Sequence, residues 1–115
     1  MKRSGIAIVK ELKGYQKKHL RGLAHGLKPV VQIGREGVTD GVIRAVDEGL
    51  SRHELIKIRF NEIREKELKE AITVELAART GSVAAGMIGH TVILYREHID
   101  PERKKIFLPR RDEDS

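Results

Sequence analysis

The chain has 115 residues, of which 39% are apolar, so it has the size of one domain with a modest core. It contains no cysteine, which excludes disulfides, thiolate metal sites and cysteine catalysis. Its net charge of +6, from 23 Lys and Arg against 17 Asp and Glu, favours an anionic partner such as nucleic acid over a surface charged only for solubility.

The N-terminal third is predicted to hold a basic helix after an extension, residues 1–12, whose structure the pattern does not define. From Tyr15 onward, apolar residues recur three or four positions apart and would form one buried stripe: Leu20, Leu23, Ala24 and Leu27. Basic residues fall away from this stripe, on the face expected to meet solvent: Lys17, Lys18, Arg21 and Lys28. Gly26 and Pro29 are expected to end the helix.

The positive charge is concentrated in this third of the chain. Residues 1–37 hold nine basic and two acidic residues, a net +7, whereas residues 38–101 hold nine basic and eleven acidic residues, a net −2. Such an asymmetric field favours a binding face over general solubility.

A short strand, a glycine loop and a second helix follow. Residues 30–33 (VVQI) are typical of a strand, and Gly34 and Gly37 then bracket a tight loop. The second helix is predicted over residues 40–52, with Thr39 as its N-cap.

The remainder continues the alternation of strands and helices. Residues 55–60 alternate as a half-buried strand, with Ile56, Ile58 and Phe60 on one side and Lys57 and Arg59 on the other. A third helix is predicted over 65–79, and two strands, 82–88 and 91–95, are joined by a turn at Gly89-His90. Residues 105–108 are predicted to add a short edge strand, and residues 110–115 to form a polar tail.

The predicted order is therefore α-β-α-β-α-β-β, an α/β domain over residues 13–109. Alternation of this kind predicts a mixed four-stranded sheet packed by helices.

The glycine loop, Gly34-Arg35-Glu36-Gly37, is the strongest candidate site. A loop between a strand and a helix places backbone N–H groups near a helix N-terminus, which attracts phosphate. Glycines allow unusual backbone angles and let a sugar-phosphate chain approach closely, and Arg35 at the tip can pair with phosphate. A tight turn with no ligand explains two glycines three residues apart equally well. The loop has neither the Gly-Lys-Ser/Thr ending of a nucleotide-triphosphate loop nor a Gly-x-Gly-x-x-Gly fingerprint.

Three segments in the same order as in a known family make the sequence identifiable. Residues 20–39 (LRGLAHGLKPVVQIGREGVT) closely resemble the opening of the CRM domain, the chloroplast RNA splicing and ribosome maturation domain found in bacteria as YhbY-like proteins. Residues 53–58 (HELIKI) resemble its second strand, and residues 88–96 (IGHTVILYR) resemble its final hairpin.

The resemblance implies a fold similar to the C-terminal domain of translation initiation factor three. It also implies RNA binding through the Gly-x-x-Gly loop and an association with precursors of the large ribosomal subunit. Many members have Lys after the first loop glycine, and Arg35 keeps that charge and gains a fork suited to phosphate. The residues expected to contact RNA are the loop, a basic helix face and one residue after the last strand: Gly34, Arg35, Glu36, Gly37, Lys17, Lys18, Arg21, Lys28 and Arg96.

Other classes of function are less well supported by the residues. The five histidines lack metal-ligand spacing such as His-Glu-x-x-His, and no serine lies in a nucleophile elbow, so neither an enzyme nor a bound metal or cofactor is expected. The alternative is a general KH-like binder of single-stranded nucleic acid without a ribosomal role. With four aromatic residues, the chain is not expected to stack several bases.

The expected location and partners follow from the same features. A first apolar run interrupted at Lys10 and Glu11 does not resemble a signal peptide, and no run approaches the roughly 20 residues of a membrane helix. We therefore expect a cytoplasmic monomer that binds rRNA and neither a membrane nor a small-molecule substrate.

Overall fold

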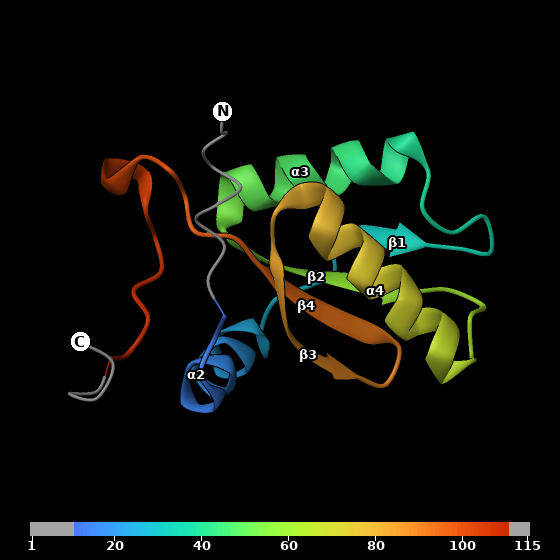
Figure 1. Cartoon of the computed structure of the whole chain (residues 1–115), viewed down its shortest axis with the longest axis horizontal. Coiled ribbons are helices and arrows are strands. Elements are labelled where there is room, and N and C mark those ends of the chain that lie inside the picture. Colours follow the sequence, from blue (N-terminus) through green and yellow to red (C-terminus); the bar gives the residue numbers. More distant parts are fainter. Residues whose placement is uncertain (1–10, 111–115) are drawn as a thin grey trace.

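The structure, a computed structural model, describes residues 11–110. Three helices and four strands follow one another along the chain (Figure 1): α2 (Gly14–Ala24), β1 (Val31–Ile33), α3 (Asp40–His53), β2 (Leu55–Phe60), α4 (Lys66–Thr80), β3 (Val83–Ile88) and β4 (Thr91–Tyr95). A short 3-10 helix, η1 (Pro101–Arg103), follows the last strand. The predicted order α-β-α-β-α-β-β is confirmed.

The strands form one mixed sheet in the order β1-β2-β4-β3. Strands β1 and β2 are parallel, with Val31 opposite Ile58, and the other two pairs are antiparallel. The carboxyl ends of β1 and β2 therefore lie at the same end of the sheet as the turn between β3 and β4. Whatever follows β1 is thus placed beside the β2–α4 connection and that turn.

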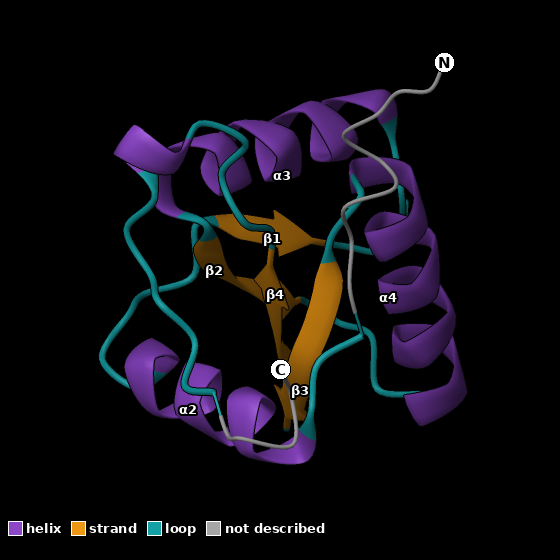
Figure 2. Ribbon diagram, turned by 60° about the vertical axis from the view of Figure 1, so that its left-hand side comes forward, coloured by secondary structure: helices purple, strands orange, loops and turns teal. Residues whose placement is uncertain are grey.

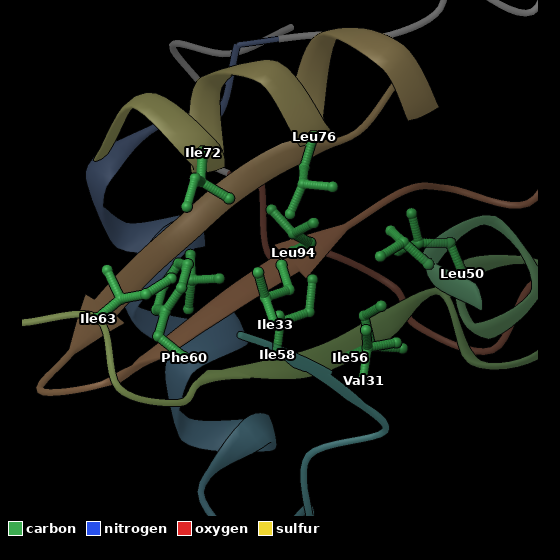
Figure 3. Packing of buried hydrophobic residues seen from close by; sticks show 12 residues of the cluster. Val31, Ile33, Leu50, Ile56, Ile58, Phe60, Ile63, Ile72, Leu76 and Leu94 are labelled. Atoms are coloured by element: carbon green, nitrogen blue, oxygen red, sulfur yellow. The ribbon is translucent and has the colours of Figure 1, made fainter. Parts of the chain in front are cut away.

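Helices cover the two faces of the sheet unequally (Figure 2). Helices α3 and α4 pack on one face over the larger core, to which β2 contributes Ile56, Ile58 and Phe60 (Figure 3). Helix α2 packs on the other face over a smaller cluster that includes Leu55 and Ile93. The alternation along β2 thus has the predicted sense, because Lys57 and Arg59 face away from the larger core.

Helix α2 ends next to Gly26, as predicted, but its buried face is smaller than predicted. It ends at Ala24, before Gly26, and the amide of Leu27 bonds to the carbonyl of Ala24 in a following turn (2.9 Å). Only Leu20 and Ala24 of the predicted stripe are buried, whereas Leu23 and Leu27 are 45% and 42% exposed. The helix contacts the sheet along a narrow line, so it buries two apolar residues instead of four.

Residues 105–108 do not form the predicted edge strand. The amides of Lys105 and Ile106 each donate to Oε1 of Glu54 at 2.8 Å, and the amide of His98 donates to Oε2 at 2.6 Å. Glu54 follows α3 with a positive φ of 64° and is 1% exposed. The N–H groups that a strand would give to a neighbour are given to a buried carboxylate instead.

We call residues 98–110 the C-terminal strap. Beyond Glu54, the strap continues to α2, where Nε2 of Gln16 donates to the carbonyl of Pro109 at 3.1 Å. In Figure 1 the strap runs down the left-hand side from η1 towards α2. Leu12, Ile106 and Leu108 pack against the smaller core, so the start of the described chain and the strap both help to close it.

Replacing Glu54 by Gln tests this anchor. The amide keeps the size of the side chain but presents N–H donors to backbone N–H donors, so we expect a loss of about 2 to 4 kcal/mol in the free energy of unfolding. Urea unfolding measures the loss, and amide hydrogen exchange at Lys105 and Ile106 should accelerate. The control is Glu97→Gln, which removes only a partly exposed ion pair with Lys104 (3.6 Å) and should cost less than about 1 kcal/mol. Equal stabilities of the two variants would contradict the anchor.

Candidate nucleic-acid interface

The glycine loop is a tight turn at one end of the sheet. The amide of Gly37 donates to the carbonyl of Gly34 at 3.0 Å, and Gly37 has a φ of 72°, which side chains other than glycine adopt poorly. Gly34 has no positive φ, and a Cβ built there would meet no atom within 4 Å. The backbone conformation therefore requires glycine at 37 but not at 34. Because Gly34 is exposed and has no side chain, a ligand can approach its backbone closely.

The N-terminus of α3 already has a side-chain cap and an acidic residue. Thr39 is its N-cap, as predicted, and its hydroxyl accepts from the amide of Val42 at 3.1 Å. Asp40, in the first helical turn, already supplies a negative charge there. The attraction for phosphate in this region therefore rests on Arg35, which is exposed, as Glu36 is.

Three connections converge around the loop, at the right-hand end of Figure 1. The amide of Asn61, just after β2, donates to the carbonyl of Ile33 at 2.8 Å, and the amide of Phe60 donates to the carbonyl of His90 at 2.8 Å. Hydrogen bonds from the backbone amides of Glu65 and Arg64 lower the pKa of the Glu65 carboxyl, and the charge of Arg35 lowers it further. The glycine loop thus shares one surface with the start of α4.

A polar strip extends from this end across the face of the sheet that carries α2. Helix α2 covers only part of that face. Beyond it lie polar side chains from β1, β2, β4 and the residue just after β2, which we call the sheet track: Gln32, Lys57, Arg59, Asn61 and Thr91. Gln32, Arg59 and Thr91 occupy one row across three strands. Nδ2 of Asn61 donates to Oε1 of Gln32 at 2.6 Å, and Nε of Arg59 donates to Oδ1 of Asn61 at 3.3 Å.

The sheet track was missing from the predicted site. The sequence places Lys57 and Arg59 on the side of β2 away from the larger core, but it does not show that α2 leaves them uncovered. Lys57 also joins the track to α2, because its Nζ donates to the carbonyls of His25 (3.3 Å) and Leu27 (3.0 Å).

The basic residues predicted for the helix face meet different neighbours in the structure. Arg21 lies on the flank towards β3, where its Nη1 donates to the carbonyl of Ala85 at 3.1 Å. Lys17 and Lys18 lie one turn earlier, four and three residues before Arg21 and so next to it on the helix surface, and Lys18 also lines a groove whose lining includes Arg110. Lys28 is exposed in the connection to β1. The basic residues near the loop in sequence are therefore connected to it only across the sheet track.

Arg96 lies at the opposite end of the sheet from the glycine loop. It follows Tyr95, which pairs with the first residue of β2, whereas the loop follows Ile33, which pairs with the last. Its guanidinium donates to Oδ1 of Asp47 (2.6 Å), the carbonyl of Thr80 (2.8 Å), the carbonyl of Asp47 (3.1 Å) and the hydroxyl of Ser51 (2.9 Å). Arg96 ties α3 to the end of α4, and the structure does not bring it to the predicted site.

Within residues 11–110, no group of three or more His, Cys, Asp or Glu side chains is arranged to hold a metal ion. In the same range, no helix is long and apolar enough to cross a membrane. The exposed, polar, partly cationic surface at the loop and the sheet track can pair with anions and hydrogen-bond to polar groups.

Three helices on a mixed four-stranded sheet, with a Gly-x-x-Gly loop after the first strand, define the class of small α/β modules to which this chain belongs. A family model described as the CRS1 / YhbY (CRM) domain matches residues 12–96. The chain belongs to this family, and the resemblance found in the sequence is confirmed.

Relatives from bacteria match nearly their full length. An RNA-binding protein of Haemophilus influenzae is 40% identical, over 84% of this chain and 93% of that protein. YqeI of Bacillus subtilis, named a probable RNA-binding protein, is 38% identical, over 85% and 99%. The solution structure of SAV1595 from Staphylococcus aureus, a hypothetical protein for which RNA binding is suggested, superposes with a TM-score of 0.72 at 32% identity, covering 86% of this chain and all of that one.

A double-mutant cycle tests the structural role of Arg21. A Cβ at Gly86 would lie 2.7 Å from Cδ of Arg21, so Gly86→Ala forces that side chain to move. We expect Gly86→Ala to cost about 1 to 2 kcal/mol of unfolding free energy in the parent chain but much less in an Arg21→Ala background. Urea unfolding of the four proteins measures the coupling, and strict additivity would show that Arg21 does not pack on β3.

Proposed function

We propose that this protein binds structured RNA of large ribosomal subunit precursors and assists their assembly without chemistry of its own. RNA binding is the function named for its relatives. The observation that carries the proposal for this chain is a set of cations at one face and one end of the sheet. Arg59 and Lys57 lie on the face of β2 that carries α2. Lys57 bonds to the carbonyls of His25 and Leu27 just after α2, and Arg21 of α2 bonds to the carbonyl of Ala85. Arg35 lies in the glycine loop that follows β1, the neighbour of β2 in the sheet. The bound RNA would lie along this surface, with its phosphates facing these cations.

The chemistry of the surface favours contacts with the RNA backbone over stacking on bases. Phe60 and Tyr95 are 2% and 4% exposed and belong to the cores, so neither the loop nor the sheet track presents an aromatic ring. The neutral members of the track are Gln32, Asn61 and Thr91. Their amide and hydroxyl groups can donate hydrogen bonds to phosphate oxygens and can donate to or accept from ribose hydroxyls. Recognition by shape and backbone is how proteins bind double-helical RNA, and this favours structured RNA over the KH-like, single-strand alternative.

Charge reversal at the surface tests the proposal. Arg35→Glu and Arg59→Glu should each weaken binding to a structured fragment of the large-subunit rRNA precursor about tenfold or more, because each replaces a charge-assisted contact by repulsion. Each loss should also reduce the slope of log K against log salt by about 0.7 to 0.9. Arg52→Glu, at the exposed end of α3 on the other side of the sheet, is the matched control. If a variant that carries both Arg35→Glu and Arg59→Glu binds this RNA as well as the parent does, the proposed RNA-binding surface is wrong.

The choice of RNA separates the proposal from its alternative. We expect the precursor fragment to compete with the labelled probe far better than unrelated single strands of equal length. Equal competition would instead favour a general single-strand binder with no ribosomal role.

The two glycines of the loop should have separable effects. Gly34→Ala introduces a methyl group into open space at an ordinary backbone angle, so it should leave the unfolding free energy within about 0.5 kcal/mol and still weaken RNA binding. Gly37→Ala should cost about 1 kcal/mol or more because of its positive φ. Thermal unfolding and fluorescence-anisotropy titration measure the two effects. A Gly34→Ala variant with normal RNA affinity would mean that the loop is only a turn.

A further inference from the structure

We infer that the groove between α2 and the end of the C-terminal strap is a second RNA contact, which takes an unpaired nucleotide. The groove is lined by five residues of α2 and two of the strap: Tyr15, Lys18, His19, Gly22, Leu23, Pro109 and Arg110. This inference rests on the proposed function, because it names the kind of RNA segment that a further part of the same protein recognises.

The groove lies beside α2. Tyr15, Lys18, His19 and Gly22 follow one another at helical spacing and so share one side of the helix. The hollow has a volume of ≈ 580 Å³, within the range of about 300 to 1,000 Å³ found for small-ligand sites. It is a shallow hollow open to solvent, which suits one residue of a polymer that is also held elsewhere.

The lining combines an apolar floor with a cationic rim. Leu23 is 45% exposed, although its spacing predicts burial, and Gly22 has no atom within 4 Å of the position of a Cβ. Together with the ring of Tyr15 and with Pro109, they form a surface against which a base can lie. Lys18 and Arg110 are both exposed at the edge, and among residues 11–110 the lining contains no acidic side chain. A flat apolar ring joined to a phosphate is the ligand that matches both parts.

The groove depends on the docked strap. Glu54 holds the strap at Lys105 and Ile106, and Gln16 of α2 donates to the carbonyl of Pro109. These two anchors together place Pro109 and Arg110 against the helix. The contrast with the sheet track is chemical: the track has no exposed ring and suits backbone contacts, whereas the lining of the groove includes Tyr15, Leu23 and Pro109.

An unpaired extension on a structured RNA tests the inference. The probes are one RNA hairpin with and without a 3′ single-stranded extension of about 10 nucleotides, within the usual range of about 4 to 16 nucleotides for single-strand sites. We expect the extension to raise the affinity of the parent protein about tenfold, the typical gain from stacking one base. Gly22→Leu, which fills the groove without lowering helix propensity, should abolish that gain, and Lys18→Glu should reduce it.

Matched controls separate loss of the groove from other effects. Gly14→Leu makes the same substitution in the same helix, also in open space but outside the groove, and should keep the gain. Arg52→Glu serves as the control for the charge change in Lys18→Glu. An extension that brings no gain to the parent protein, or a gain that survives Gly22→Leu, would overturn the inference.

The bare hairpin distinguishes this inference from the proposed function. Gly22→Leu should bind the bare hairpin as the parent does. Failure of the parent to bind any hairpin would count against the proposed function. The groove would then be judged on the isolated single strand, whose binding must still be lost in Gly22→Leu for the inference to stand.

Discussion

The structure depends on one mismatch, between a four-stranded sheet and the helix that covers its second face. Helix α2 packs against β2, β3 and β4, but a single helix is only about 10 to 12 Å across and cannot cover the full length of strands of five or six residues. On the opposite face, α3 and α4 together bury Ile56, Ile58 and Phe60 of β2. The same central strand thus contributes a fully buried row to one side and, on the other, a row that is apolar at Leu55 and cationic at Lys57 and Arg59. The sheet track is the polar part of this second face, the part that α2 does not cover.

Most of the fold could be predicted because it follows from local patterns. The period of two along β2, the β-branched run in β4 and the Thr39 cap before α3 each predict an element that the structure contains. The segment after β4 was predicted wrongly because its partner is not local. The apolar residues at 105–108 fit a strand, in which backbone amides would donate to a neighbouring strand. In the structure the amides of Lys105 and Ile106 donate instead to the carboxylate of Glu54, about fifty positions earlier in the chain, and no local pattern indicates that partner.

The candidate site was predictable to a smaller extent, and for a related reason. A loop is contiguous in sequence, so Gly34 to Gly37 could be located, whereas a surface across strands is assembled by register. Arg59 joins the site because it lies opposite Gln32 on one side and Thr91 on the other. Arg96, predicted from its position after a strand, lies at the other end of that register and bonds to Asp47, Thr80 and Ser51. Charge in the sequence therefore indicates the kind of partner, whereas strand register decides which charged side chains share a surface.

Helix α2 contributes both to the fold and to the candidate site, because its side chains contact three different parts of the molecule. Leu20 and Ala24 face the sheet, Arg21 bonds to the edge of β3, and Leu23 with Lys18 borders the strap. A helix that served only to cover a core would bury Leu23, since an exposed leucine gains nothing from its contact with water. The strap could have covered this leucine, but it reaches α2 through the carbonyl of Pro109 and leaves the groove open beside it. The exposed Leu23 departs from a simple amphipathic pattern, and it lies in the groove whose lining also includes the cationic Lys18. Local departures of this kind are expected where a surface is selected for binding and not only for folding.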